Sequence, residues 1–593
     1  MTSFSCKSVF AGVALVATLA VGDIPLQMHP DFELKEVVLP NLYKTTGMEF
    51  LSDGRLVIAT TDFIGGGELP PDGPSPDHKV LIISNPGGAS PTVKEVANKW
   101  LQPIGVTIVN DKVYISDRDG FYEILDLVNP SDLGMNRKKI ASWPDEGAWN
   151  VYGKQWHQWV FTPVYANGFF YAPYSGSIQN GGPSKTPATT AYSGAFLKWD
   201  LSGKLEKFAG GLRSPNGANI APNGDMFVAD NQGSWLPAST FMHMKKDKFY
   251  GHKQTGNPPN WAESLPYEPP TAWLPYGTVR SSPSQPLYVD RGRYQGDWLL
   301  GDENSPGLVR IGLDNVEGTY NGAVFWFGKG FKDEIINNNI QASAISRMAW
   351  GKDGSFYVGT IQKLGNWPGE TSLQPMYKVT PKATATAFDI KGIRHLADGV
   401  EIEFTEPVNP ATITIGNFPI KQWNYTRKEG YGDGKGPEID LTASGIETST
   451  DGKRVHLIIP GLSVNYLAYF KLDKANVKSA TGALLWNNEG WFTLNKLSTR
   501  KWDGTVSIAD PALKSSHLNG LLRHRASATG LEVILDASGP MSATLRALDG
   551  SSVSKGTGTG SLNLSTQGLA KGLYFLEVRH GAEKLVRSIS LTF

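Results

Sequence analysis

Along the first two thirds of the chain, short apolar runs are separated by polar turns, and the apolar runs come in pairs. Each pair is an apolar run, a turn with Gly, Asp or Asn, and a second apolar run. Six copies occur, the fifth of them looser: "GMEFLSDGRLVIATTD" (47–62), "GVTIVNDKVYISD" (105–117), "WVFTPVYANGFFYAPY" (159–174), "GANIAPNGDMFVAD" (217–230), "PLYVDRGRYQGDWLLGD" (286–302) and "RMAWGKDGSFYVGT" (347–360). Alternating runs joined by such turns predict β-hairpins.

The spacing of the turns indicates how the hairpins are organised. Asp53, Asp111, Asn167 and Asn223 are separated by steps of 58, 56 and 56 residues, and the 130 residues from Asn223 to Asp353 leave room for one more copy and an insertion. This period is too long for helical solenoids and suits four-stranded sheets. Because radial repetition protects sheet edges, we predict an all-β fold that begins with a six-bladed β-propeller over residues 35–384. The alternative is a pair of irregular β-sandwiches.

The repeat also predicts where a ligand would bind. If each hairpin is the inner half of a blade, the ends opposite the turns gather on one face near the axis, where propellers commonly bind ligands. The residues expected there are mostly polar: Thr46, Asp62, 117–119, 155–158, 213–216, 230–232, 302–304, Ser346, Arg347 and Gln362.

The remainder of the chain has a different pattern. Residues 385–497 contain longer alternating strands and predict an Ig-like β-sandwich, and "EFTEPVNPATIT" resembles the opening of bacterial Ig-like modules. Between its strands, the Gly-rich stretch "TRKEGYGDGKGPEID" (426–440) is expected to be a solvated loop rather than a binding surface. A polar linker is predicted over 498–526, and a second small β-sandwich over 527–593.

The two ends of the chain predict export. Lys7 precedes a short apolar run from Val9 to Ala20, so residues 1–22 are predicted to be a secretory signal peptide. At the other end, "LRALDGSSV", "LAKGLYFLEV" and "EKLVRSISL" closely resemble the C-terminal sorting domain of the type IX secretion system. That resemblance implies the secretion machinery as a partner and a secreted or outer cell-surface location; the alternative is a small accessory sandwich.

Composition excludes several functions. The 56 basic and 56 acidic residues balance, which argues against a nucleic-acid surface, and no later segment is apolar enough to cross a membrane. The only cysteine, Cys6, lies in the predicted signal peptide. The mature chain therefore lacks the residues for a disulfide, a zinc–thiolate site, a c-type haem or a cysteine nucleophile. No G-x-S-x-G, H-E-x-x-H or P-loop motif occurs.

Three motifs resemble the soluble quinoprotein glucose/sorbosone dehydrogenase superfamily, most closely its large secreted branch. They are "GLRSPNGANIAPNGDMFVADNQGSW" followed by "KKDKFYGH", "GDWLLGDENSPGLVRI" and "SRMAWGKDGSFYVGT", and the resemblance covers about residues 38–380. It implies a propeller that binds pyrroloquinoline quinone and Ca²⁺ at the channel mouth and oxidises a sugar or sugar-derived alcohol. An anionic cofactor needs guanidinium groups, a base near neutral pH suits imidazole, and Ca²⁺ takes oxygen ligands.

The resemblance assigns roles to residues of this chain. His157 is the expected base, and Asp230, Asp302 and Glu303 are expected to ligate Ca²⁺. The residues expected to bind the cofactor are Arg213, Asn216, Gln232 and Arg347. Two features depart from the family pattern: Ser214 and Asn216 replace an Asn and a Gln after the Arg, and "DENSPGLVRI" offers acids where the family has a Lys.

Each assignment has a structural alternative. His157 stands between Trp156 and Trp159 and could pack there, Arg213 could tie blades together, and the acids could cap loops. Three functions therefore stay open: a sugar oxidoreductase, a glycan- or partner-binding propeller without cofactor, and a Ca²⁺-dependent hydrolase of lactones.

Overall fold

The computed structural model describes most of the chain between Met28 and Leu591. The described residues are 28–37, 39, 42, 44–61, 74–143, 159–176, 191–253, 261–303, 307–328, 334–336, 339–341, 343–363, 376–504, 522–527, 529–535, 538–547, 551–570, 572–581 and 583–591. In this part of the chain, regular structure is almost entirely β-strand, with three short 3₁₀ helices at Trp261–Ser264, Pro410–Thr412 and Ile415–Asn417. None of the helices in these residues is long and apolar enough to cross a bilayer.

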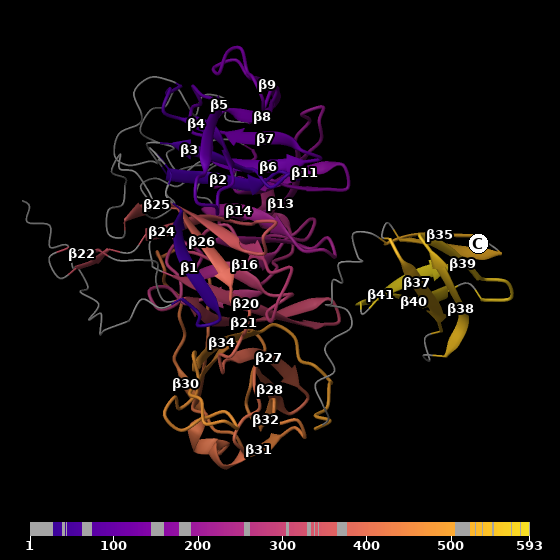
Figure 1. The fold of residues 1–593 in the computed structure, drawn as a ribbon. Helices are drawn as coiled ribbons and strands as arrows, with labels where there is room; N and C mark the ends of the chain where they lie inside the picture. The colour runs from indigo at the N-terminus through magenta and orange to yellow at the C-terminus, as the bar shows by residue number, and fades with distance from the viewer. Residues whose placement is uncertain are drawn as a thin grey trace, which may run out of the picture.

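Six four-stranded antiparallel arrays follow one another around a ring (Figure 1). The first blade consists of β2 (Lys44–Phe50), β3 (Leu56–Thr61), β4 (Lys79–Ser84) and β5 (Thr92–Ala97). The second consists of β6 (Gly105–Val109), β7 (Lys112–Asp117), β8 (Gly120–Ile124) and β9 (Arg137–Ser142). The third consists of β10 (Val164–Ala166), β11 (Phe169–Pro173), β12 (Ala195–Trp199) and β13 (Glu206–Gly210). The fourth is β14 (Pro215–Ile220), β15 (Met226–Asp230), β16 (Ser239–His243) and β17 (Ala272–Leu274), and the fifth is β18 (Leu287–Tyr288), β19 (Trp298–Leu300), β20 (Leu308–Val316) and β21 (Thr319–Gly328).

The sixth blade closes the ring with the N-terminal strand. It consists of β24 (Ser343–Trp350), β25 (Phe356–Lys363), β26 (Met376–Pro381) and, outermost, β1 (Phe32–Val37). In the register of β1 with β26, Phe32 faces Pro381 and Val37 faces Met376. A separate hairpin, β22 (Glu334–Ile336) with β23 (Asn339–Gln341), precedes this blade. The chain thus has a strand from each end of the propeller in one sheet, which resists opening of the ring.

The predicted hairpins are the inner halves of the blades. The first strands of neighbouring blades contact one another from β24 through β2, β6, β10 and β14 to β18, which places them nearest the axis. Their turns have the expected chemistry: Asn110 and Asp111 both have positive φ, of 50° and 60°, as a two-residue hairpin turn requires. The six-bladed propeller is therefore confirmed.

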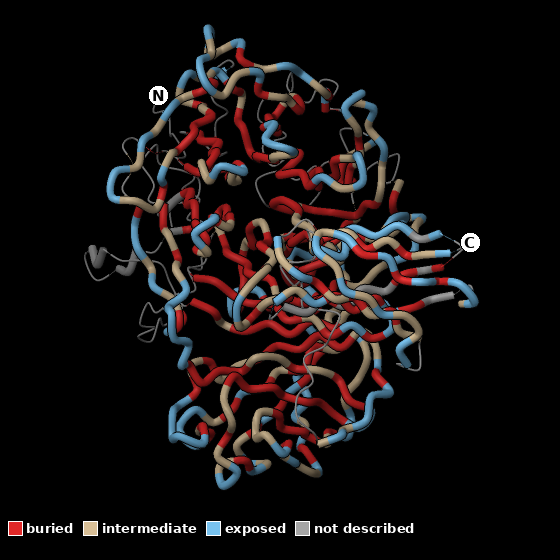
Figure 2. The backbone as a smooth tube through the Cα atoms, turned by 45° about the vertical axis from the view of Figure 1, so that its right-hand side comes forward, coloured by how far each residue is buried: buried red, intermediate tan, exposed pale blue. Residues whose placement is uncertain are grey.

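Apolar side chains from adjacent blades pack against one another and form the cores. One cluster joins Val57 and Ala59 of β3 to Val113 and Ile115 of β7. Each blade therefore buries both faces, which explains the nearly continuous burial of its middle strands. In Figure 2 the buried backbone runs through the interior, and the exposed backbone is concentrated in the outer turns.

The second domain is built directly onto the fifth blade. Its strands are β27 (Ile390–Leu396), β28 (Gly399–Phe404), β29 (Ile420–Asn424), β30 (Ile439–Leu441), β31 (Gly445–Thr448), β32 (Arg454–Ile458), β33 (Tyr466–Lys471) and β34 (Glu489–Leu494). One sheet has the order β27-β28-β32-β31, and the other, β30-β29-β33-β34, continues into the blade because β34 pairs with β21. One hydrophobic cluster fills the space between the two sheets.

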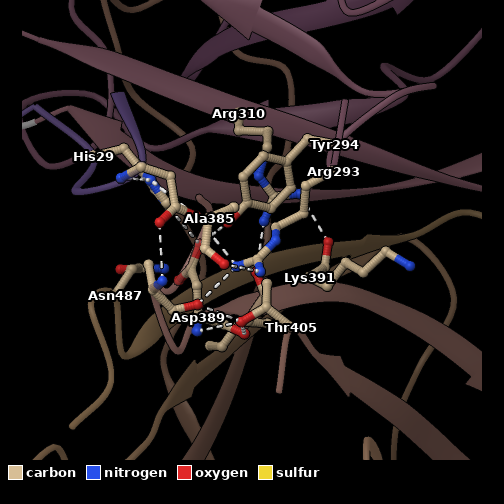
Figure 3. A network of polar contacts seen from close by, with 12 residues as sticks. His29, Arg293, Tyr294, Arg310, Ala385, Asp389, Lys391, Thr405 and Asn487 are labelled. Atoms are coloured by element: carbon tan, nitrogen blue, oxygen red, sulfur yellow. Dashed lines mark hydrogen bonds and ion pairs between the residues drawn. The ribbon is translucent and has the colours of Figure 1, made fainter. Parts of the chain in front are cut away.

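A buried polar network also joins the propeller to the second domain (Figure 3). The hydroxyl of Tyr294 donates a hydrogen bond to Asp389 at 2.8 Å and accepts one from Nε2 of His29 at 3.0 Å. Arg310 donates to the carbonyl oxygens of Ile390 and Lys391 at 2.6 and 2.8 Å, and it also pairs with Asp297. Sheet continuity and this network hold the second domain in one position on the blade.

The last strands form a separate seven-stranded array. They are β35 (Leu522–Ala526), β36 (Gly530–Leu535), β37 (Pro540–Arg546), β38 (Ser552–Thr559), β39 (Ser561–Ser565), β40 (Gly572–His580) and β41 (Glu583–Leu591), in the order β35-β36-β39-β38-β37-β40-β41. Strands β38 and β39 meet only at the Gly560 corner, and one cluster gathers apolar residues from both halves. The array is therefore folded onto itself around its own core.

Candidate functional site

At the ends of three inner hairpins, a carboxylate accepts backbone hydrogen bonds from the segment that leads into its own blade. Asp230 accepts hydrogen bonds from the backbone N–H groups of Arg213, Ser214 and Asn231, each at 2.7 Å. Asp302 accepts from Ser281 and Ser282 at 2.6 and 2.9 Å, and Asp117 accepts from Leu101 and Gln102 at 3.0 and 2.7 Å. In the third blade the hydroxyl of Ser175 accepts from Trp159 at 2.9 Å. These groups close the mouth end of each blade.

Burial raises the pKa of Asp230 to about 6, and the three backbone donors oppose that shift. Burial also raises the pKa of Asp117. A carboxylate that faces several N–H donors is already satisfied, so Asp230 and Asp302 have a structural function in this fold. Their expected role as Ca²⁺ ligands stays a prediction. Among the described residues, no three His, Cys, Asp or Glu side chains are grouped so that they could hold a metal ion.

Arg347 lies at the centre of the ring and connects three alternate blades. Its Nη1 donates to Oδ1 of Asn216 in the fourth blade at 3.0 Å and to the carbonyl oxygen of Ser346 at 2.8 Å. Its Nη2 donates to the carbonyl oxygen of Ile104, at the start of the second blade, at 2.9 Å. The side chain is fully buried. Burial lowers the pKa of its guanidinium to about 10, and the nearby Glu303 opposes this.

Glu303 completes the axial cluster. It accepts a hydrogen bond from the amide of Asn216, and Ser346 also bonds to it. Burial raises the pKa of its carboxyl to about 7, although Arg347 acts in the opposite direction. Asn216, Glu303 and Arg347, which lie far apart in sequence, thus converge at the axis. The cluster places an acid that changes charge near neutral pH beside an amide and a cation.

Arg213 and Gln232 form a second cluster at the mouth, beneath the second domain. The guanidinium of Arg213 lies 5.2 Å from the centre of the Tyr431 ring and is hydrogen-bonded to that side chain. Burial lowers the pKa of Arg213, and Tyr431 and Asp230 oppose the shift. Gln232 is 6% exposed, and its buried Oε1 has no hydrogen-bond partner within the part of the chain that the structure describes. The two side chains therefore lie under a cover that the propeller does not itself supply.

The loop 426–440 of the second domain supplies this cover, whereas the sequence suggested a solvated loop. Lys428 accepts a backbone hydrogen bond from Trp235 at 2.8 Å, and Gly432 donates one to Gly233 at 3.2 Å. Tyr431 forms an isolated β-bridge with Ser234. Most residues of this loop are exposed, as predicted for a solvated loop, but sheet continuity also brings the Gly-rich segment against propeller backbone, a contact that local composition does not encode.

Hydrogen bonds connect the two clusters. The N–H of Gln232 donates to the hydroxyl of Ser239 at 3.2 Å, and that hydroxyl donates to the carbonyl oxygen of Ser281 at 3.1 Å. The next residue, Ser282, accepts from the N–H of Glu303 at 2.8 Å. A path through the backbone of residues 281–282 thus links the cluster of Arg213 and Gln232 to that of Asn216, Glu303 and Arg347. His157, the expected base, lies outside the described residues.

The structure adds residues that sequence reasoning did not select. Arg118 donates to Oε1 of Gln102 at 2.7 Å, and its guanidinium lies 4.7 Å from the centre of the Trp159 ring. His252 is fully buried; burial, followed by the charge of Arg213, lowers its pKa to about 3. Arg118 stands within the predicted rim, so its position was a usable signal. The contact of Tyr431 had no local signal.

No family model matches the chain, and no curated protein matches it. Solved structures of similar shape include a putative oxidoreductase (glucose dehydrogenase) from Thermus thermophilus, with 13% identity and a TM-score of 0.42 over 59% of this chain and 99% of that one. The PQQ-bound aldose sugar dehydrogenase of Streptomyces coelicolor has 14% identity and a TM-score of 0.40 over 59% and 99% of the two chains. The PQQ domain of pyranose dehydrogenase from Coprinopsis cinerea has 12% identity and a TM-score of 0.40 over 60% and 97%. The chain is thus similar to solved sugar dehydrogenase propellers at low identity.

Proposed function

We propose that this chain binds a sugar or a sugar-derived small molecule at the mouth of the propeller channel. The observation that carries the proposal is the convergence of Asn216, Glu303 and Arg347 with Gln232 and Arg213 at one end of the channel. Sugar hydroxyls both donate and accept hydrogen bonds, so a mixture of carboxyl, amide and guanidinium groups suits them. The resemblance of the sequence motifs to the glucose/sorbosone dehydrogenase superfamily supports the same ligand class.

The proposed setting is outside the cell. The predicted signal peptide and the resemblance of the last domain to type IX sorting domains support secretion or attachment at the outer surface. A sugar-binding protein in this setting would meet extracellular carbohydrate.

The described residues do not fit the predicted pair of quinone and Ca²⁺. Both Nη atoms of Arg347 donate to protein oxygens, and the carboxylates of Asp230 and Asp302 accept backbone N–H groups. Arg213 lies against the Tyr431 ring. The proposal therefore contains no step that depends on the quinone. Because the two carboxylates already accept backbone hydrogen bonds, they do not support a Ca²⁺-dependent hydrolase either.

Oxidation of the bound sugar is the second candidate function: Glu303 would take the hydroxyl proton, and an added two-electron acceptor, a quinone or a dye, would take the hydride from the sugar carbon. The carboxyl of Glu303 has a pKa raised to about 7, so it can accept a proton from a sugar hydroxyl near neutral pH. The test is dye reduction by the full chain with a panel of sugars, with and without added pyrroloquinoline quinone and Ca²⁺. Dye reduction that depends on added sugar supports oxidation. If no combination of sugar, quinone and Ca²⁺ reduces the dye, oxidation is ruled out and the binding proposal remains.

Binding is tested by calorimetric titration of the full chain with D-glucose, D-galactose, D-xylose, D-glucitol and D-gluconate. Glu303→Gln is expected to weaken binding of the best ligand by roughly 10- to 100-fold, the usual effect of losing a charged hydrogen bond. The matched control is Glu49→Gln. Glu49 is likewise half-buried with a pKa raised to about 8, but it accepts a hydrogen bond from the N–H of Ile108 at the turn end of the blades, so its replacement is expected to leave affinity unchanged. The proposal is wrong if the wild-type chain binds no probe, or if both variants weaken binding equally.

A further inference from the structure

Tyr431 belongs to the second domain but lies at the propeller mouth. Its ring stands over Arg213, while 43% of the residue remains exposed. The exposed part of this ring leaves apolar area in water beside a polar site, so a ligand that covers it would gain stabilisation.

The backbone around Tyr431 is fixed on both sides. Trp235 donates to the carbonyl oxygen of Lys428, and Gly432 donates to that of Gly233. Gly432 has a φ of 64°, and a side chain there would collide with the amide of Gln232. Glycine therefore favours this close approach of the loop, since another residue would have to adopt positive φ and displace the Gln232 amide.

The same loop is held at a second point. Arg427 lies 3.9 Å from the centre of the Tyr267 ring and 5.5 Å from that of Phe249, and its Nη1 donates to the carbonyl oxygen of Gly251. Since β34 pairs with β21, the domain that carries the loop is itself fixed on the fifth blade. The ring of Tyr431 therefore has a defined position relative to Arg213 and Gln232.

A second observation points to a ligand at this position. Among the described residues, no group donates a hydrogen bond to the buried Oε1 atom of Gln232, which lies directly beneath the loop. A buried acceptor left unpaired costs free energy, and unpaired groups at a mouth are commonly those that a ligand satisfies. Sugar hydroxyls are donors of the required kind.

We infer that Tyr431 is a specificity-determining residue of the propeller site, and that its exposed ring receives the apolar face of a cyclic sugar beside the polar groups of the mouth. This inference rests on the proposed sugar-binding function and deepens it, because it selects cyclic sugars over open-chain ones. A pyranose presents several C–H groups on one face, which pack well on an aromatic ring, whereas an open-chain alcohol has no such face.

The test is titration of the full chain and three variants with the cyclic and open-chain probes. Tyr431→Ala is expected to weaken binding of the best cyclic sugar at least tenfold, and Tyr431→Phe to stay within threefold of wild type because the ring remains. Tyr276→Ala is the matched control: Tyr276 is 47% exposed and lies outside the loop contact, so its removal should leave affinity unchanged.

The outcomes separate the two proposals. If wild type binds a cyclic sugar and Tyr431→Ala binds it equally well, the inference is wrong and sugar binding stands. If Tyr431→Phe loses as much affinity as Tyr431→Ala, the ring is not the platform, and the inference is also wrong. If wild type binds no probe, both fall. Urea unfolding of each variant checks that the fold is intact.

Discussion

Replacement of Arg347 by methionine is predicted to weaken the propeller substantially. The guanidinium makes two hydrogen bonds across the axis, to Asn216 and to the carbonyl oxygen of Ile104. Hydrogen bonds to charged groups contribute about 1.5–3 kcal/mol each, and removing one member of a buried charged cluster costs about 3–5 kcal/mol. Glu303 limits the cost because its pKa of about 7 lets it take up a proton. We therefore expect a loss of about 3 kcal/mol in the free energy of unfolding.

Tryptophan fluorescence during urea unfolding measures this loss selectively. The last tryptophan is Trp502, so residues 503–593 contribute no signal and the fluorescence reports on the propeller and the second domain. The control is Arg55→Met, which removes an exposed turn pair with Asp53 and is expected to cost less than about 1 kcal/mol. A loss below about 1 kcal/mol for Arg347→Met would refute the view that this side chain ties alternate blades together.

Three further predictions concern the acids and the domain boundary. Asp230→Ala leaves three backbone N–H groups without their acceptor and is expected to cost about 3 kcal/mol in the same unfolding assay; a cost near zero would contradict the capping role. The pKa of Glu303 rises from 4.5 to about 7 on folding, so the native state keeps a proton that the unfolded chain has released, and stability falls as pH rises through this window. Glu303→Gln should therefore reduce the difference in urea midpoint between pH 5 and pH 7, and an unchanged difference would count against a raised pKa. A chain ending at Gly504 should unfold as the full chain does, whereas one ending at Thr384 exposes the edge of β21 and should aggregate or unfold at lower urea. Equal midpoints for the two truncations would show that the shared sheet adds no stability.

The inner hairpins were predictable because local chemistry specifies them. Turns such as Asn110–Asp111 carry the turn signal, and continuous apolar runs such as the start of Leu56–Thr61 carry the burial signal, each in a few adjacent residues. The outer strands were harder to locate. β9, with the sequence "RKKIAS", is largely exposed and carries charge, and β1 pairs with a strand more than 300 residues away. Neither has a local pattern that distinguishes it from a loop.

The site was predictable in position but not in detail. Five of the expected residues meet at the mouth because the repeat places hairpin ends together. Asp230 could be either a metal ligand or a cap by sequence alone, since an Asp after a strand suits both, and only the structure shows that it accepts three backbone hydrogen bonds. Tyr431 reaches the mouth through the pairing of β34 with β21, which no window of sequence encodes.

The central claim is that the propeller and the loop of the second domain together form one sugar site. The most direct measurement is a crystal structure of the full chain soaked with the cyclic sugar that binds best in titration. The account predicts density for the sugar against the ring of Tyr431, with hydroxyls within hydrogen-bond distance of Gln232 or Glu303. Sugar density elsewhere on the molecule, or an ordered sugar that contacts the mouth without touching Tyr431, would contradict it.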